Sequence, residues 1–416
     1  MERKITKFDD KTIQEIFGHE AAENENKQRL KEYYFKSKTF ERITADLPLR
    51  ILVGHKGIGK SALFMIAMQE DEDDGVLSIL IRPDDVQGIE TKGNDILQSI
   101  RSWKDGLLDI LYNKVIDSLH LEGAPAFKTY LGKVGRMTNF ITEVLAPVIT
   151  QYVNVEVCRK KVVSEFAQRK KINIYIDDLD RGWRGDRDSI ARLSALLNAL
   201  RDLSTENDGL NFKVALRSDV YYLVRTSDES TDKIEGAVVW HSWTNHEILA
   251  MLIKRVESFF GFPKDEIQLM KMKQRDMACL LNSIMEPIFR GCGKWENVPI
   301  YRILMSLIRK RPRDLIKLCS LAANHAAIEG RMLIVTADWE SIFSEYSQGR
   351  LQDTINEFRS ELPEIKKLLF GMKPNKREKQ TKQEYVYTTD SLFKKIKNIE
   401  QQGSFLFYDG RKAGVR

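Results

Sequence analysis

The sequence GHKGIGKS at residues 54–61 could bind a phosphate group. It matches the pattern GxxxxGK[ST] and lies between an apolar run and a second run of helical character. Three glycines allow the backbone to turn its N–H groups toward a phosphate, and a helix starting here would point its positive end at the same anion. Accidental glycines in a strand–turn–helix are the alternative. We predict that ATP is held by Gly54, His55, Lys56, Gly57, Ile58, Gly59, Lys60, Ser61 and Ala62.

Two of these loop residues and two later carboxylates would carry the chemistry. The ammonium group of Lys60 can reach the terminal phosphates, and the hydroxyl group of Ser61 can bind Mg²⁺. The run INIYIDDLD reads as a buried strand that ends in carboxylates. We predict that Asp177 holds Mg²⁺ directly or through water and that Asp178 deprotonates the attacking water. Exposed carboxylates at a strand end are the alternative.

Arginines near two other element ends are candidates for sensing the nucleotide. The strand NFKVALRS ends at Arg217 and Ser218, and either could sense the terminal phosphate; we assign Arg217 to the catalytic set. In RKRPRDLIKLC, Pro312 suits a helix start, and Arg311 and Arg313 lie where the helix dipole disfavours cations. A bound phosphate would explain them, and we predict that Arg313 contacts the nucleotide. Ordinary surface arginines are the alternative.

Arg181 and Arg184 follow the acidic strand in the glycine-flanked segment DRGWRGD. Either could reach into a neighbouring subunit as an arginine finger, which would make the chain a homo-oligomer. A local ion pair with a nearby carboxylate is the alternative.

Strands that alternate with helices predict a parallel sheet covered on both faces. A helix is expected from about residue 60 to 69, the acidic run at 70–75 reads as a loop, and LKEYYFKSKTFERI has apolar residues at helical spacing. The expected strands are LRILV at 49–53, VLSILI before Pro83, 172–180, 211–218 and 237–243. After them the sequence predicts helices only, from 244 to 328.

This order divides the chain into four predicted parts. They are an N-terminal helical segment at 1–48, a core at 49–243 with a helical insertion at about 92–170, a helical lid at 244–330, and a helical C-terminal region at 331–416. A charged linker is expected at 371–384, and the chain's end reads as a helix and then a hairpin with its turn near Asp409 and Gly410.

Composition narrows the classes of protein. No apolar stretch is long enough to span a membrane, the N-terminus lacks a secretory signal, and four scattered cysteines lack metal-ligand spacing, so we expect a cytoplasmic chain with reduced thiols and no membrane partner. The net charge is +6, and the residues from Lys366 onward hold 13 Lys and Arg against 5 Asp and Glu. This basic tail could bind nucleic acid or an acidic partner, although a solvated surface is the plainer interpretation.

Five segments occur in an order that resembles a known family. FGHEAAENE, VGHKGIGKSAL, YIDDLDRGW, LRSDV and RPRDLIKLC, within roughly residues 15–350, resemble a family of bacterial P-loop ATPases that was first described from a cyanobacterial genome and is related to the KAP and STAND groups. The resemblance implies an α/β P-loop NTPase fold (ASCE/AAA-like) with a parallel sheet core, helical insertions, a helical lid and a C-terminal winged-helix-like region. It also implies that FGHEAAENE closes over the nucleotide base.

The resemblance further implies a function. STAND relatives are signalling switches, and many bacterial ones are associated with anti-phage defence, so a regulatory ATPase that acts with a partner effector is expected. Many AAA+ enzymes carry Asp-Glu where this chain has Asp177 and Asp178. The shorter second carboxylate would slow hydrolysis, which suits a switch.

Two other functions stay open at this point. A DNA-handling initiator-type ATPase also joins such a core to a lid and a winged helix, and the basic tail would favour it. A scaffold that holds nucleotide without hydrolysing it is the second alternative, and the intact Asp177–Asp178 pair argues against it. The six histidines show no metalloprotease spacing.

Overall fold

A computed structural model describes residues 5, 7–90, 95–118, 171–227, 229–359, 362–380 and 387–401. The chain divides into two compact units. The first comprises residues 1–181 and 191–342, and the second comprises residues 182–190 and 343–416. The sheet, the predicted phosphate loop and, apart from residues 187–190, the helices up to residue 342 belong to the first unit.

The first unit is built on a parallel sheet of five strands in the order β2-β3-β4-β1-β5. Strands β3 and β4 are buried along their whole length, as expected for parallel strands covered on both faces. The register pairs Val53 with Leu216 and with Trp240, so the strands end together at their carboxyl ends. The strands are β1 (Leu49–Val53), β2 (Leu77–Ile81), β3 (Ile172–Ile176), β4 (Leu210–Leu216) and β5 (Val238–Trp240).

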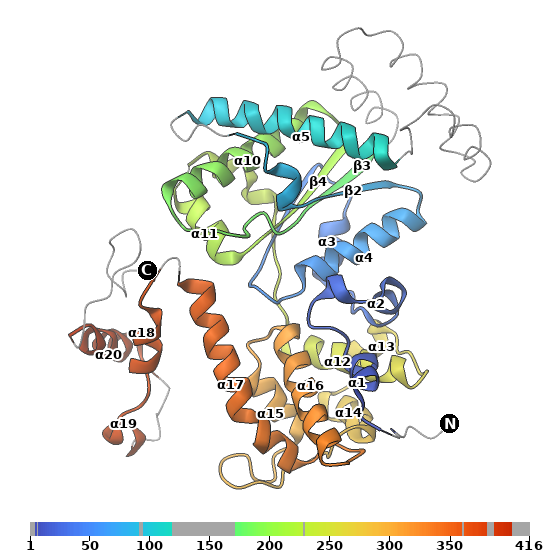
Figure 1. Ribbon diagram of the computed structural model, residues 1–416, viewed down its shortest axis with the longest axis vertical. Helices are drawn as coiled ribbons and strands as arrows, with labels where there is room; N and C mark the ends of the chain where they lie inside the picture. Colours follow the sequence, from blue (N-terminus) through green and yellow to red (C-terminus); the bar gives the residue numbers. More distant parts are fainter. Residues whose placement is uncertain are drawn as a thin grey trace. The chain divides into compact units, whose positions relative to one another are not determined.

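Helices cover both faces of this sheet (Figure 1). On one face, α2 (Lys27–Tyr33), α3 (Lys38–Thr44) and α4 (Lys60–Asp73) pack on a cluster that includes Leu52 and Ala215. On the other lie α5 (Ile96–Ser118) and α10 (Arg187–Glu206), which are joined where the Trp103 indole donates to the Arg192 carbonyl at 3.1 Å. The predicted P-loop NTPase fold is confirmed by this strand order, with the phosphate loop between β1 and α4.

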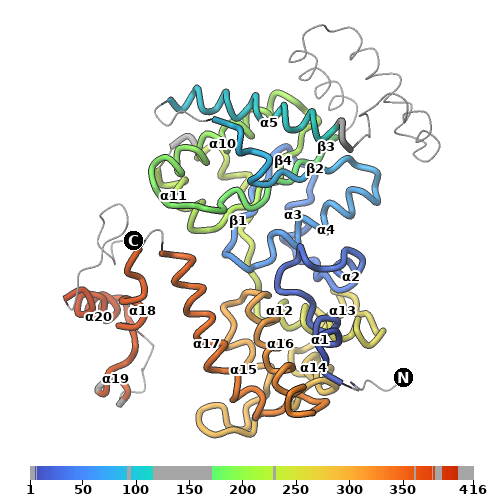
Figure 2. Tube along the Cα trace, viewed as in Figure 1, coloured from blue at the N-terminus to red at the C-terminus, as the bar shows by residue number. Residues whose placement is uncertain are grey.

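After β5 the described residues form a helical region, as the sequence predicts. The isolated bridges Met285–Ile334 and Ile288–Pro299 add no strand to it. Its elements are α12 (Asn245–Phe259), α13 (Glu266–Lys271), α14 (Gln274–Ala278), η5 (Cys279–Ser283), α15 (Ile300–Leu307), α16 (Pro312–Ile328) and the start of α17 (Thr336–Phe358). Figure 2 shows α1 (Asp10–Phe17) beside α12 and α16, so the chain's first helix packs with this later region.

Short helices complete the two units. In the first unit these are η1 (Ala22–Asn24), η2 (Pro83–Val86), α11 (Ser218–Ser227) and η4 (Glu229–Ala237). In the second, α18 (Ile365–Gly371) and α20 (Thr389–Gln401) pack through Ile365 and Ile399, and α19 (Lys376–Gln380) lies within the expected linker. The predicted hairpin near Asp409 and most of the predicted insertion at 92–170 lie outside the described residues. The predicted winged helix and the predicted domain limits stay predictions.

The prediction of a loop at 70–75 is wrong. The acidic run at 70–75 continues α4 to Asp73, because Asp71 accepts hydrogen bonds from the Asn173 amide at 2.7 Å and the Tyr175 hydroxyl at 2.8 Å on β3. In the run 172–180, β3 ends at Ile176, so Asp177 is the first residue after the strand, as predicted, and the carboxylates lie in a turn.

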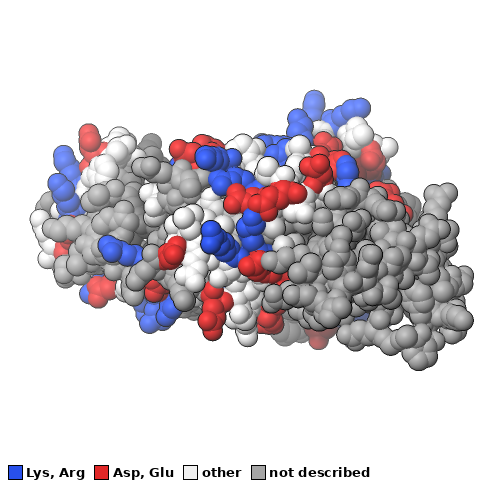
Figure 3. Space-filling model, turned by 90° about the horizontal axis from the view of Figure 1, so that it is seen from above, with Lys and Arg blue, Asp and Glu red and all other residues white. Residues whose placement is uncertain are grey.

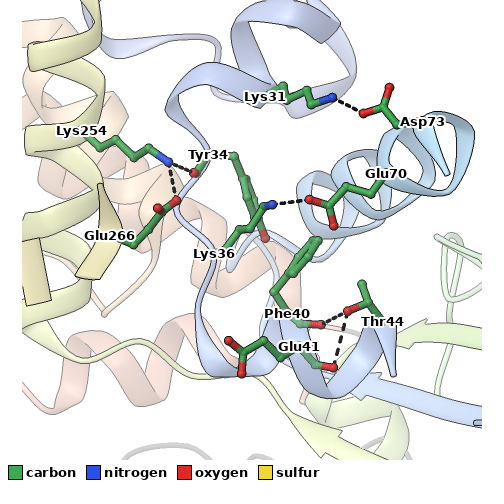
Figure 4. A network of polar contacts seen from close by, with 10 residues as sticks. All are labelled: Lys31, Tyr34, Lys36, Phe40, Glu41, Thr44, Glu70, Asp73, Lys254 and Glu266. Carbon is green, nitrogen blue, oxygen red and sulfur yellow. Dashed lines mark hydrogen bonds and ion pairs between the residues drawn. The ribbon is translucent and has the colours of Figure 1, made fainter. Parts of the chain in front are cut away.

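The N-terminal helical segment is interrupted between α2 and α3. There the Tyr34 carbonyl accepts from the Lys254 ammonium at 2.6 Å instead of from a helical N–H group (Figure 4). Lys36, in the same break, pairs with Glu70 on α4, and Lys31 pairs with Asp73. The segment at residues 17–36, which we call the N-terminal strap, is thereby fixed to α4 and to α12.

No helix within the described ranges has both the length and the apolar character needed to cross a bilayer.

Candidate nucleotide site

The phosphate loop takes its shape from glycines at three positions. Gly57 and Gly59 have φ angles of +77° and +104°, a left-handed region that other residues rarely adopt. Gly54 has no room for a side chain, because a Cβ atom there would lie 3.0 Å from Ile58 and 3.3 Å from the His241 carbonyl oxygen. The strand–loop–helix context that the sequence predicts is therefore present, with β1 ending at Val53 and α4 beginning at Lys60.

The Lys60 side chain folds back into this loop. Its ammonium group donates to the Gly54 carbonyl oxygen at 2.9 Å and to the His55 carbonyl oxygen at 3.4 Å. Burial lowers the pKa of Lys60, while the nearby carboxylates of Asp180 and Asp177 oppose that change. The site thus holds a buried cation with hydrogen-bond donors that a phosphate oxygen could take over.

The predicted metal ligands lie together at the carboxyl end of β3. The Ser61 hydroxyl donates to the Asp177 carboxylate. Burial raises the pKa of Asp177, and the Ser61 hydrogen bond and the Lys60 charge act against that rise. A hydroxyl and a carboxylate are oxygen donors of the type that Mg²⁺ binds, and they flank the helix start that would face the phosphates. The residues present therefore fit a Mg–nucleotide complex.

The turn after β3 holds two more carboxylates, Asp178 and Asp180, which differ in exposure. Asp178 has a φ angle of +60° and is exposed, and its N–H group donates to an Asp177 carboxylate oxygen at 2.9 Å. Asp180 is only 6% exposed and accepts from the Arg217 backbone N–H at 2.8 Å. Burial raises the pKa of Asp180, and the Lys60 charge lowers it.

Asp180 is the residue that sequence reasoning missed. The prediction assigns roles only to the two carboxylates that directly follow the strand. The left-handed backbone of Asp178 turns the chain, and Asp180 then lies close enough to Lys60 for the two charges to interact. The available signal was the third carboxylate of DDLD.

Arg217 and Ser218 follow the end of β4, and their side chains have different partners. The Ser218 hydroxyl lies 2.8 Å from the His55 Nδ1 atom, so it touches the phosphate loop. The Arg217 guanidinium pairs with Asp219, with Nε donating at 3.2 Å. Of the two candidates, Ser218 therefore has the loop contact, and the catalytic role of Arg217 stays a prediction.

The start of α16 lies directly against the loop. The Arg313 N–H group donates to the Gly57 carbonyl at 3.4 Å, and a Cβ atom on Gly57 would lie 3.3 Å from the Arg313 side chain. The Arg313 guanidinium donates to the Glu20 carbonyl at 3.1 Å, and Lys317 pairs with the Glu20 carboxylate at 2.9 Å. The structure thus brings Arg313 to the loop and links it to the N-terminal strap.

The strap begins with a tight turn that the resemblance assigns to the nucleotide base. Gly18 has a φ of +76° and faces the side chains of Arg255, Tyr33 and Glu25 without room for a Cβ atom. Glu25 accepts from the His19 N–H at 2.8 Å and from the Tyr33 hydroxyl at 2.6 Å. The buried Arg255 guanidinium donates to the Phe17 carbonyl and lies 4.1 Å from the Tyr33 ring centre. This turn is rigidly held beside the Glu20–Arg313 contact.

A cavity of about 290 Å³ opens at the metal side of the loop. Ser61, Asp177 and Asp178 lie at one end, and an apolar wall from α4 and β2 lies beyond them. Arg181 lines this cavity. Arg184, by contrast, is 77% exposed and pairs with Asp186 at 3.3 Å, and a role for either arginine in a neighbouring subunit stays a prediction. The other lining residues are Glu23, Phe64, Met65, Met68, Leu80, Arg82, Pro83 and Asp84.

The end of β5 supports the loop from below. His241 is 4% exposed, its N–H group donates to the Val53 carbonyl at 2.8 Å, and its ring centre lies 5.5 Å from that of Trp243. The Trp243 indole donates to the Ile58 carbonyl at 2.8 Å. Burial, assisted by the Lys60 charge, lowers the pKa of His241 from 6.5 to about 4, so this ring is neutral near pH 7.

Sequence comparisons relate this chain to two described groups. Residues 264–355 match the model of the FunZ-associated C-terminal helical domain. An 80.3 kDa protein of Escherichia coli (strain K12), named for transposon gamma-delta, is 24% identical over 383 residues, which are 84% of this chain and 52% of that protein. The chain thus spans about half the length of this relative.

Solved structures with similar folds are P-loop proteins. A Walker-type ATPase of Pyrococcus abyssi is 14% identical, with a TM-score of 0.42 over 88% of this chain and 89% of that one. The Aeropyrum pernix ORC2 protein is 12% identical, with a TM-score of 0.36 over 71% and 61%. The Thermotoga maritima RuvB Holliday junction branch migration motor is 12% identical, with a TM-score of 0.36 over 78% of each chain. At this level of similarity, the fold assignment rests on the strand order and loop of this chain itself.

Replacing Lys60 tests the nucleotide assignment. Lys60→Ala should weaken Mg–ATP binding by roughly 1.5–3 kcal/mol, because a charge-assisted contact to phosphate is lost. Isothermal calorimetry measures the change, and Lys38→Ala, an exposed lysine on α3, is the matched control. Unchanged affinity in Lys60→Ala would mean that nucleotide, if bound, lies elsewhere.

His241 should make stability depend on pH. Its depressed pKa means that its contribution is fully present above the unfolded value of 6.5 and is lost as the pH falls toward about 4. The full effect is up to about 3 kcal/mol. Urea unfolding at pH 7 and pH 4.5 should therefore show a smaller loss for His241→Asn than for the native chain. Asp177 and Asp180 titrate with the opposite sign, so only the difference between the two proteins is diagnostic. Equal losses would contradict the assignment.

Proposed function

We propose that this chain binds and hydrolyses Mg–ATP and uses the nucleotide state as a molecular switch. The observation that carries the proposal is the convergence of Lys60, Ser61 and Asp177 on one glycine-shaped loop. A buried ammonium group, a helix N-terminus and a hydroxyl–carboxylate pair are together what a Mg–triphosphate requires.

Each residue has a defined task in this proposal. The loop N–H groups and Lys60 hold the phosphates, while Ser61 and Asp177 hold the metal. Bound ATP would supply the anhydride bond that is broken, and Mg²⁺ would neutralise part of the phosphate charge. The protein must then orient one water molecule and accept its proton.

The carboxylate that accepts this proton is inferred to be Asp178. It lines the cavity at the metal side, where water can enter, whereas Asp180 is buried and accepts the Arg217 N–H group. Asp180 is better suited as a positioning residue that fixes the end of β4 and offsets the Lys60 charge.

The two carboxylates can be separated by experiment. Asp178→Asn should keep nucleotide binding while hydrolysis falls by roughly 10²–10⁴-fold, since the proton acceptor is lost. Asp180→Asn should lower stability and change nucleotide affinity, because a buried partner of Lys60 loses its charge. Phosphate release and calorimetry on both variants provide the two readouts. Native turnover in Asp178→Asn would remove it from the mechanism.

A switch also needs a path from the nucleotide to the rest of the unit. Arg313 touches Gly57 and holds the Glu20 carbonyl, and the strap that contains Glu20 is tied to α4 and α12. A phosphate that attracts the Arg313 guanidinium would therefore compete with the strap for it. The resemblance to bacterial signalling ATPases supports a regulatory role with a partner effector, in the setting of anti-phage defence, and assembly into a homo-oligomer.

Arg313 is the residue at which this coupling can be cut. Limited proteolysis should show that a non-hydrolysable ATP analogue protects the helical region in the native chain but much less in Arg313→Ala. Arg101→Ala, which removes an exposed arginine of α5, is the control. If the analogue protects Arg313→Ala as well as the native chain, Arg313 does not transmit the nucleotide state.

A DNA-handling ATPase is the second candidate. The relative named for a transposon and the basic tail favour it. On the face seen in Figure 3, however, basic and acidic side chains of the described residues are interspersed. Binding to duplex DNA that weakens steeply with salt would support this candidate over the switch alone.

A further inference from the structure

A second cavity lies within the helical region, and none of its lining residues belongs to the nucleotide site. It has a volume of about 430 Å³ and is enclosed by α14, η5, residues 285–288 and the start of α15. All of these elements fall within residues 264–355, the range that matches the FunZ-associated helical domain. Its volume is in the range of sites that hold small organic molecules.

The inner surface of this cavity is apolar. Leu281, Met285 and Ile300 each have only 2% of their surface exposed and form its base. Ile288 also lines the cavity, and 43% of its surface is exposed. An apolar body could therefore exchange water for contact with these side chains.

The charge at the rim is positive. Arg275 on α14 and Arg302 on α15 are both exposed lining residues. The Arg302 Nε atom donates to the neutral Tyr301 hydroxyl at 3.3 Å, and in the described part of the chain Arg275 has no side-chain hydrogen bond or ion pair. The lining carboxylate, Glu286, accepts from the Thr336 N–H at 3.1 Å and from the Thr336 hydroxyl at 3.2 Å, and the two arginines outweigh its single negative charge.

We propose that this cavity is a binding site for a small organic anion, with a carboxylate or phosphate group held by Arg275 and Arg302 and an apolar body on Met285 and Ile288. Guanidinium groups bind both kinds of anion through paired hydrogen bonds. Asn282, also at the rim, offers an amide donor. The site is independent of the nucleotide and would give the helical region a ligand of its own.

The chain carries a reporter and its internal control. Cys279 lines the cavity and is exposed, whereas Cys292 is exposed but does not line it. Alkylation by neutral iodoacetamide can be followed at each cysteine by peptide mass spectrometry. Millimolar octanoate or hexyl phosphate should slow alkylation of Cys279 at least about threefold while leaving Cys292 unchanged, because a bound ligand covers the thiol.

Two comparisons make the result decisive. Octanamide has the same apolar body without the charge and should give little protection. Arg275→Gln and Arg302→Gln should abolish the protection by both anions, while Arg101→Gln, an exposed arginine on α5, should keep it. These arginines are on the surface, so their replacement should leave the fold intact, which the ¹³C-methyl NMR signal of Met285 verifies.

The two anions distinguish the possible sources of the ligand. Protection by octanoate alone indicates a carboxylate ligand, and protection by hexyl phosphate alone indicates a phosphate ester; either supports the site. Absence of protection by both, equal protection by octanamide, or protection that persists in Arg275→Gln and Arg302→Gln would overturn the proposal.

Discussion

The buried ammonium group of Lys60 is the interaction on which the site depends. A cation held away from water is costly unless carbonyl groups and carboxylates surround it. Here the Gly54 and His55 carbonyls accept its hydrogen bonds, and Asp177 and Asp180 supply the opposite charge. These groups come from two segments, the loop after β1 and the turn after β3, so the ends of these strands must lie close together on either side of β4.

The parallel sheet meets this requirement at low cost. Since Val53 pairs with Leu216 and Ile176 pairs with Val214, the ends of β1, β3 and β4 lie at one edge. Gly54 is then pressed against the His241 carbonyl, and the Trp243 indole holds the Ile58 carbonyl from below. The loop is therefore confined from two sides, and that confinement is a reason for Gly54 in addition to the close approach of a phosphate.

This explains why part of the site could be predicted from the sequence. The loop, the strands and Asp177 are encoded in short runs, since apolar β-branched residues predict a buried strand and the residues just after it must lie at the sheet edge. The fold class follows from their alternation with helices. Contacts between distant segments have no such local signal. No residue pattern around Asp180 predicts the φ of +60° at Asp178. No pattern in FGHEAAENE predicts that the Glu20 carbonyl accepts a hydrogen bond from Arg313.

At the acidic end of α4, the local composition predicts the wrong structure. Its composition favours a loop, yet Asp71 is required as the partner of Asn173 and Tyr175 on β3, so the helix continues. Tertiary hydrogen bonds to a buried strand outweigh a local preference worth a few tenths of a kcal/mol per residue, roughly.

The polar contacts of the strap differ in burial between the two regions that it joins. Its pairs with α4 are exposed, with 41% and 58% of the Lys31 and Asp73 side chains accessible, and such pairs contribute little. On the α12 side, Lys254 is only 9% exposed and binds both the Tyr34 carbonyl and Glu266 (Figure 4). Arg255, next to it, is buried against Tyr33 and the Phe17 carbonyl.

Breaking a buried pair leaves an uncompensated charge, whereas an exposed pair is replaced by water at almost no cost. Apolar packing adds to these polar contacts, because Leu30 and Tyr34 of the strap are buried in the same cluster as Phe64 of α4, so the strap is held to both regions. Arg313 on α16 lies between the strap and the loop, because its guanidinium group donates to the Glu20 carbonyl of the strap while its N–H group donates to the Gly57 carbonyl of the loop. Because Arg313 contacts Gly57, a movement of the helical region would change a contact at the phosphate loop.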